Sequence, residues 1–137
     1  MREIKFRGRS ILSNQFVYGH LLEMYHKTSD SLMLLPYIIG SLPESPLIYV
    51  KRETIGQFTG LADKNGVEIY EGNICLCDVN SIDYITIVYF KHGTYYLQDN
   101  IKEGNLSLSW FIDNNKKIEV IGNIHDNPEL LTKIGRK

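Results

Sequence analysis

The sequence predicts a mainly β protein, with a curled antiparallel sheet or small barrel-like fold, an irregular excursion at about residues 27–48 and a short C-terminal helix. Three observations predict this fold class. Apolar and polar residues alternate with a period of two in many segments. An Asn65-Gly66 pair separates two β-prone runs. Helix-start signals are found only near the C-terminus. A chain of 137 residues is long enough for one core, so we expect a single domain over residues 1–137.

The first two strands are expected at the N-terminus. In the segment REIKFRGRS, Ile4 and Phe6 alternate with Lys5 and Arg7, which is the pattern of a half-buried strand. The segment QFVYGHLLEMY continues this pattern and then becomes apolar on both sides. The two segments therefore predict an opening hairpin that turns around Ser13-Asn14.

Residues 27–48 interrupt the pattern. They contain three of the four prolines and have no sustained period, so we expect an irregular excursion that is a candidate binding loop. Its apolar residues are expected either to pack against another subunit or to close one end of the chain's own barrel.

The middle of the chain carries the strongest local signal. Asn and Gly tolerate the positive φ angles of tight hairpin turns, so Asn65-Gly66 predicts a hairpin. The segments NICLCDV, DYITIVYF, YYLQD, LSLSWFI and IEVIGNI follow as further strands, for a total of seven or eight. In LSLSWFI, alternation is expected to place Leu108 and Trp110 on the same face.

The C-terminal segment predicts a short helix. Asn127 is a suitable cap and Pro128 suits the first helical position because its φ angle is fixed.

Net charge, the N-terminal segment and the two cysteines bear on the partners and the cellular location of the protein. Fifteen basic and 16 acidic residues give a net charge of −1, which supplies no argument for a nucleic-acid or membrane partner. The N-terminus lacks the apolar core of a signal peptide, so a soluble, cytoplasmic protein is expected. Cys75 and Cys77 lie two residues apart in a predicted strand, near the limit for a disulfide, and free thiols are expected.

Three blocks carry a resemblance to a known family. They are REIKFRG, TIGQFTGLADKNGVEIYEGNI and EVIGNIHDNPELL, at the start, middle and end of the chain. With these blocks the sequence resembles the YopX family, whose members are encoded by bacteriophages and prophages. Asn73 departs from the family pattern, which more usually reads EGD.

The resemblance implies a predominantly β, barrel-like fold and a phage or prophage origin, and it implies no activity. The shared blocks are rich in glycines, turn residues and core aliphatics, and they contain no matched nucleophile, base and orienting group. Physically, these blocks specify a fold rather than a catalytic site.

Basic residues give one candidate site. Lys5, Arg7 and Arg9 fall on one face of a strand, with Arg52 as a possible neighbour, and together they form a candidate surface for nucleic acid or another partner. The competing interpretation is an ordinary solvated strand face.

A hydrolase around His125 and Asp126, the one adjacent His-acid pair, is a second alternative, although both residues suit a turn before a helix. No metal site is expected, because Cys75 and Cys77 have C-x-C rather than C-x2-C spacing. No cofactor is expected either, because phosphate-binding glycine loops are lacking.

The sequence thus predicts a non-enzymatic protein-interaction or self-assembling module. We expect a homo-oligomer, with a host or phage protein as a further partner. Binding to single-stranded nucleic acid is the first alternative and is not favoured.

Overall fold

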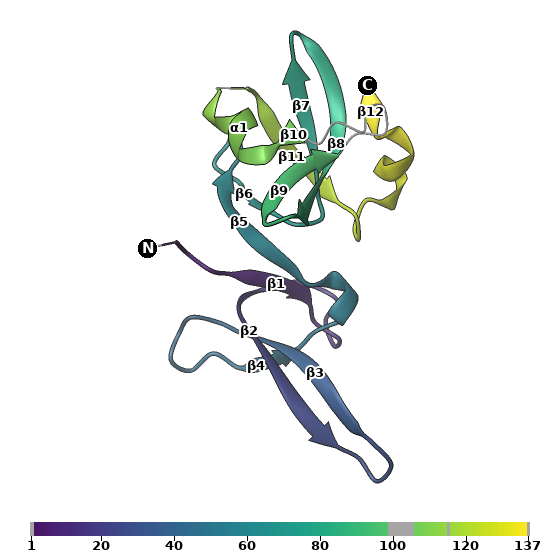
Figure 1. The fold of residues 1–137 in the computed structure, drawn as a ribbon. Helices are drawn as coiled ribbons and strands as arrows, with labels where there is room; N and C mark the ends of the chain where they lie inside the picture. The colour runs from purple at the N-terminus through teal and green to yellow at the C-terminus, as the bar shows by residue number, and fades with distance from the viewer. Residues whose placement is uncertain (1, 99–105, 115, 137) are drawn as a thin grey trace. The chain divides into compact units, whose positions relative to one another are not determined.

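The chain folds into two compact units. The structure, a computed structural model, describes residues 2–98, 106–114 and 116–136. The first unit covers residues 1–58 and the second covers residues 59–137, and each is described by itself. The strand β5 (Gly56–Ala62) begins in the first unit and ends in the second. Figure 1 shows the strands of both units with their labels. The expectation of one domain for the whole chain stays a prediction.

The first unit is an antiparallel sheet with the strand order β4-β3-β2-β1-β5. Its strands are β1 (Phe6–Arg9), β2 (Phe16–Lys27), β3 (Leu32–Ile39), β4 (Leu47–Tyr49) and the start of β5, with the 3-10 helix η1 (Arg52–Thr54) before β5. The predicted opening hairpin is confirmed: β1 pairs with β2, and Asn14 in its turn has a φ of 57°.

The expectation of an irregular excursion at residues 27–48 is wrong for much of its length. β3 occupies residues 32–39 and pairs with β2 over eight residues, from His20–Ile39 to Lys27–Leu32. Pro36 does not interrupt this ladder, because its carbonyl accepts a hydrogen bond from the Val50 nitrogen on the other side of β3. The nitrogen of Pro36, which has no hydrogen to donate, therefore also faces β4. The hydrogen bonds between β3 and β2 do not use it.

The second unit contains an antiparallel sheet with the order β10-β9-β8-β7-β11, and β12 also pairs with β8. Its elements are the end of β5, β6 (Glu68–Tyr70), β7 (Asn73–Val79), β8 (Ile82–Lys91), β9 (Thr94–Gln98), β10 (Leu106–Ser107), α1 (Leu108–Asp113), β11 (Ile118–Asn123), η2 (Pro128–Lys133) and β12 (Gly135–Arg136). Mainly β structure is thus confirmed. Neither sheet closes into a barrel within the described part of the chain.

The segment LSLSWFI is mostly a helix, so the predicted strand at this place is wrong. Only Leu106–Ser107 is extended, and α1 begins at Leu108. The oxygen of the Ser107 side chain accepts a hydrogen bond from the Trp110 nitrogen at 3.4 Å and caps the helix. Leu108 and Phe111 are buried at helical spacing, whereas Trp110 is 50% exposed.

The C-terminal helix is confirmed as the short 3-10 helix η2, which Pro128 begins. Asn127 is at the N-cap position, but its side chain accepts a hydrogen bond from the Asn123 nitrogen instead of capping η2.

The main hydrophobic core belongs to the second unit. It consists of side chains from β6, β7, β8, β9, α1 and β11: Ile69, Cys75, Cys77, Val88, Leu97, Leu108, Phe111 and Ile118. In the first unit, by contrast, Ile38 and Val50 are the large hydrophobic residues that are fully buried among those described.

Candidate functional site

Asp63 organises the turn between β5 and β6. The side chain is buried, and its Oδ1 atom accepts hydrogen bonds from the Asn65 nitrogen at 2.8 Å and the Val67 nitrogen at 2.9 Å. Gly66 has a φ of 80°, which favours glycine, so the predicted Asn65-Gly66 hairpin is confirmed. The carboxylate therefore stabilises the turn from inside.

The same carboxylate joins this turn to β11. Its Oδ2 atom accepts a hydrogen bond from the Val120 nitrogen at 2.9 Å, and the Lys64 nitrogen donates to the Ile118 carbonyl at 3.0 Å. One buried side chain thus holds together two segments that are 57 positions apart in the sequence. Charge-assisted hydrogen bonds of this kind are the stronger ones in proteins.

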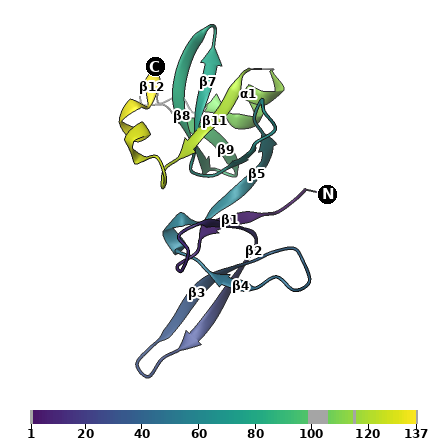
Figure 2. The same ribbon diagram turned by 180° about the vertical axis from the view of Figure 1, so that it is seen from behind.

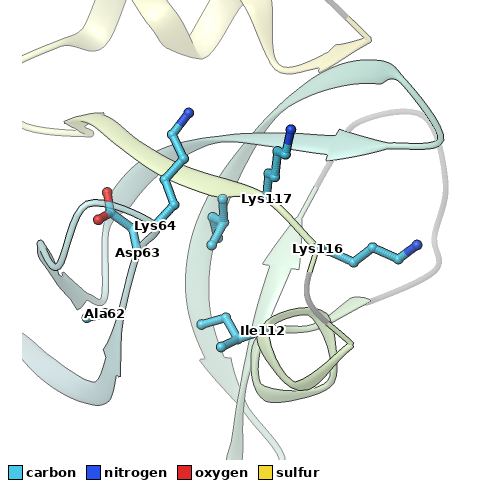
Figure 3. A pocket seen from close by; sticks show the side chains of 7 residues that line it. Ala62, Asp63, Lys64, Ile112, Lys116 and Lys117 are labelled. Carbon is cyan, nitrogen blue, oxygen red and sulfur yellow. The ribbon is translucent and has the colours of Figure 1, made fainter.

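A pocket of about 240 Å³ lies beside this junction. Ala62, Ile112 and Ile118 contribute apolar atoms, and three lysines stand around it (Figure 3). Figure 3 shows the amino groups of Lys64 and Lys117 pointing to the same side of the pocket.

The lysines of this pocket differ in their partners. Lys64 forms an ion pair with Glu119 at 3.3 Å. Within the described residues, no carboxylate lies within ion-pair distance of Lys116 or Lys117. The lining thus combines three lysines and apolar atoms with the Asp63 carboxylate, which already accepts three backbone hydrogen bonds.

The two cysteines are buried next to this region and are free, as the sequence predicts. Burial raises the pKa of the Cys77 thiol to about 11, although the hydrogen bond between this thiol and Thr86 acts in the opposite direction. The pKa of Cys75 is also raised, first by burial and then by the nearby Cys77 and Asp63. High pKa values and burial make both thiols poor nucleophiles.

Buried thiols predict a loss of stability at high pH. Between pH 9 and 11 the unfolded chain releases the Cys77 proton while the folded chain keeps it, so the free energy of unfolding falls as pH rises. From pH 8 to pH 10 we expect the Cys77 thiol to cause a loss of about 1 kcal/mol, measured by urea unfolding, and Cys75 to add to the loss in the same direction. A variant with Cys75→Ala and Cys77→Ala should lose that part of the pH dependence, and an unchanged slope would contradict the prediction.

The basic residues singled out in the sequence do not form one solvated face. Arg7 is 6% exposed and its guanidinium lies 4.6 Å from the centre of the Phe16 ring, with Arg9 at 5.2 Å from the same ring. Lys5 lies over the ring of Phe58 and pairs with Glu3 at 3.3 Å.

Arg52 begins η1, which lies beside β1, because the Thr54 hydroxyl accepts a hydrogen bond from the Arg9 nitrogen at 2.8 Å. Arg52 donates to the Glu23 carboxylate and to the Leu34 carbonyl, both at 2.7 Å. These contacts place Arg52 against the β2–β3 hairpin rather than beside Lys5. The structure brings Arg7 and Arg9 together over Phe16, while the guanidinium of Arg52 contacts Glu23 and Leu34.

His125 and Asp126 lie in a tight turn that precedes η2. The Asn123 Oδ1 atom accepts hydrogen bonds from the nitrogens of both residues, and the Asn123 Nδ2 atom donates to the Asp126 carboxylate at 2.9 Å. The Asp126 side chain is thus part of a local turn network, which is the role that the sequence context favours.

The described residues also bear on metal binding and on membrane insertion. Among these residues, no three His, Cys, Asp or Glu side chains are grouped so that they could hold a metal ion. No helix in the described ranges has the length and apolar character needed to cross a membrane.

The β2–β3 hairpin is the feature that the sequence interpretation missed. It extends from the rest of the first unit as a two-stranded ribbon in both views (Figures 1 and 2). Cross-strand partners share a face, so Leu22 and Met33 lie on one face, whereas Tyr25, Leu32 and Leu34 lie on the other. All five side chains are exposed. A signal was present, because the segments HLLEMYHK and LMLLPYII are apolar on both sides and the turn-forming TSDS separates them.

Comparison with known proteins places these features in a family. The sequence pattern of the YopX family, described as "YopX protein", matches residues 5–132. The chain belongs to the YopX family. No curated protein matches the chain. Among solved structures it is similar to "protein EF1440 from Enterococcus faecalis", with 27% identity and a TM-score of 0.57, over 96% of this chain and 99% of that one.

The blocks that carry the YopX resemblance are structural in this chain. Asp63 and Gly66 form the turn of the middle block, and Asn123 organises the turn of the last block. Asn73, the departure from the YopX pattern, is buried, accepts from the Tyr70 nitrogen at 2.7 Å and donates to the Gly122 carbonyl at 3.2 Å. An aspartate could accept from Tyr70 but could not donate to Gly122, so the asparagine amide has a role of its own here.

Proposed function

We propose that this YopX-family chain is a non-enzymatic protein-interaction module and that its binding surface is the β2–β3 hairpin. One observation carries the proposal: apolar side chains are exposed on both faces of the hairpin, with Tyr25 69% and Leu32 64% exposed. An isolated two-stranded hairpin is marginally stable in water, and exposed apolar surface of this kind is typical of binding sites.

The distribution of apolar residues supports this proposal. Of the fifteen large hydrophobic residues that are exposed among those described, twelve belong to the first unit. The same unit fully buries only Ile38 and Val50 of its described large hydrophobic residues. A unit with such a small core gains stability when a partner covers its apolar surface. Membership in the YopX family adds the expectation of a phage or prophage origin and of action in the bacterial cytoplasm.

The test is capture of partners by hairpin variants. Tagged wild-type protein, a variant with Leu22→Ser, Tyr25→Ser and Met33→Ser, and a Phe90→Ser control are expressed in the bacterium that encodes the chain. Phe90 is as exposed as the hairpin residues but lies in β8. We expect quantitative mass spectrometry to show a stoichiometric protein, either another copy or a different protein, with wild type and control. The triple variant should lose it by at least about tenfold, since each side chain contributes roughly 1 kcal/mol or more.

Equal recovery with the triple variant, or no stoichiometric protein with any of the three, would overturn the proposal. Circular dichroism checks that the variants remain folded. A partner that disappears on nuclease treatment would instead support the alternative of single-stranded nucleic-acid binding, for which Lys5, Arg7 and Arg9 were the candidates. The burial of Arg7 is the reason that this alternative stays second.

A further inference from the structure

The outer edge of β2 is open beyond Gly19. β1 pairs with β2 only from Phe16 to Gly19, and no other described strand pairs with β2 on that side. β3 covers the opposite side of β2 from His20 to Lys27. An unpaired strand edge with exposed backbone groups is a template for a further strand.

The orientation of the backbone at this edge follows from two hydrogen bonds of β3. The carbonyls of Leu34 and Pro36 accept from Arg52 and from the Val50 nitrogen, so both face away from β2. Backbone groups alternate between the two sides of a strand. Met33 and Leu35 therefore turn their N–H and C=O groups toward β2.

The cross-strand partners of Met33 and Leu35 show which backbone groups of β2 do not bond to β3. His26 and Met24 pair with Met33 and Leu35, so their backbone groups face β3. By alternation, the backbone groups of Glu23, Tyr25 and Lys27 face the open edge.

β1 gives the same assignment independently. The Lys5 carbonyl accepts from the Phe58 nitrogen in β5, so Lys5 faces β5 and Phe6 faces β2. Phe6 pairs with Gly19, whose backbone groups must then face β1. Residues at odd positions of β2 thus face this side, which includes Glu23, Tyr25 and Lys27.

We propose that this edge pairs with the same edge of a second copy, antiparallel and about a two-fold axis, with Tyr25 opposite the partner's Tyr25. The proposal rests on the proposed function and names its partner. In this register, Glu23 lies opposite the partner's Lys27 and, by symmetry, Lys27 lies opposite the partner's Glu23. The two hairpins then form one four-stranded sheet, β3-β2-β2-β3.

The pairing of charged side chains favours this register over registers shifted along β2. With Glu23 on the axis, two carboxylates face each other, and with Lys27 on the axis, two ammonium groups do. With Met24 on the axis, Glu23 faces the partner's Tyr25 and gains no charged partner. The Tyr25 register is the one that satisfies both charges twice, and it adds an aromatic pair at the centre. In the single chain the Glu23 carboxylate pairs with Arg52 at 2.7 Å, on the β3 side of β2, so dimer formation redirects Glu23 to the partner's Lys27.

The first experiment reverses the charges in the full chain and measures dimer dissociation by sedimentation equilibrium. Glu23→Lys alone and Lys27→Glu alone should each raise the dissociation constant at least tenfold, because each creates two like-charge pairs. The double variant with both changes should return to within about threefold of wild type. The control Glu44→Lys, which changes net charge away from this edge, should leave the constant unchanged, and Arg52→Gln, which frees Glu23 from its ion pair, should not raise it.

A second experiment tests the axis directly. Opposite residues in a hydrogen-bonded antiparallel pair have Cα atoms about 5.5 Å apart, within disulfide range. Tyr25→Cys should therefore form a covalent dimer under mild oxidation, whereas Leu32→Cys, which is equally exposed on β3, should not.

A double charge variant that stays dissociated, or equal cross-linking at Leu32→Cys, would overturn the register. A wild-type chain that is monomeric at about 100 µM would overturn the dimer. If that monomer still captures a different protein through its hairpin, the inference fails and the proposed function stands. If hairpin-dependent capture is also absent, both fail.

Discussion

Replacing Asp63 with alanine should lower the free energy of unfolding of the second unit by about 3 kcal/mol, because the change leaves three backbone N–H groups without their acceptor. These are the nitrogens of Asn65, Val67 and Val120, at 2.8 to 2.9 Å from the carboxylate. Hydrogen bonds to a charged group contribute roughly 1.5–3 kcal/mol each, and the three are not additive, since they share one side chain. Urea unfolding followed by circular dichroism measures the change.

Two further variants test whether the loss of stability comes from the Asp63 carboxylate itself or from the neighbouring ion pair. Asp63→Asn keeps one oxygen for Asn65 and Val67 but points an NH₂ group at the Val120 nitrogen, so an intermediate loss is expected. Lys64→Ala removes an exposed ion pair with Glu119 and should cost less than about 1 kcal/mol. Equal losses for Asp63→Ala and Lys64→Ala would show that the buried carboxylate is not what joins the turn to β11.

Local chemistry was enough to predict this turn but not its role. Asn65-Gly66 identifies a hairpin because both residues suit turns by themselves. Asp63 lies just before that pair. Nothing in the neighbouring sequence indicates that its Oδ2 atom accepts a hydrogen bond from the nitrogen of Val120, which is 57 positions later. A contact over such a distance depends on the sheet, which places β11 beside the turn. The missed role therefore reflects tertiary structure, not an overlooked motif.

The wrong prediction at residues 27–48 has a different cause. Proline usually marks a loop or an edge, and three prolines in one segment argued against a strand. Pro36 nevertheless fits β3, because its nitrogen is on the side that β2 does not use. The side on which a proline's nitrogen falls depends on the register between strands, and one sequence does not give that register.

For the basic residues Lys5, Arg7 and Arg9, the sequence predicts the shared face but not what that face contacts. Alternation correctly placed Lys5, Arg7 and Arg9 on one face, but it does not tell whether that face meets solvent or an aromatic ring. Phe16, from the paired strand β2, lies under both arginines. The cation–π contacts with Phe16 show that Arg7 and Arg9 take part in the packing of the first unit, and the binding surface stays a prediction.

Replacing Phe111 with alanine should lower the free energy of unfolding by about 3–5 kcal/mol, the range for a large aromatic residue removed from a core. Phe111 is 1% exposed and belongs to the core cluster with Leu108 and Ile118. Thermal and urea unfolding of the full chain measure the loss.

The neighbouring tryptophan is the matched control, and it decides between helix and strand at this place. In the expected strand, Trp110 would share the buried face with Leu108 and Phe111 would point outward. In α1 the order is reversed, because Leu108 and Phe111 are three residues apart and Trp110 is 50% exposed. Trp110→Ala should therefore cost less than about 1 kcal/mol. A large loss of stability for Trp110→Ala with a small loss for Phe111→Ala would instead indicate a strand at this place and contradict α1.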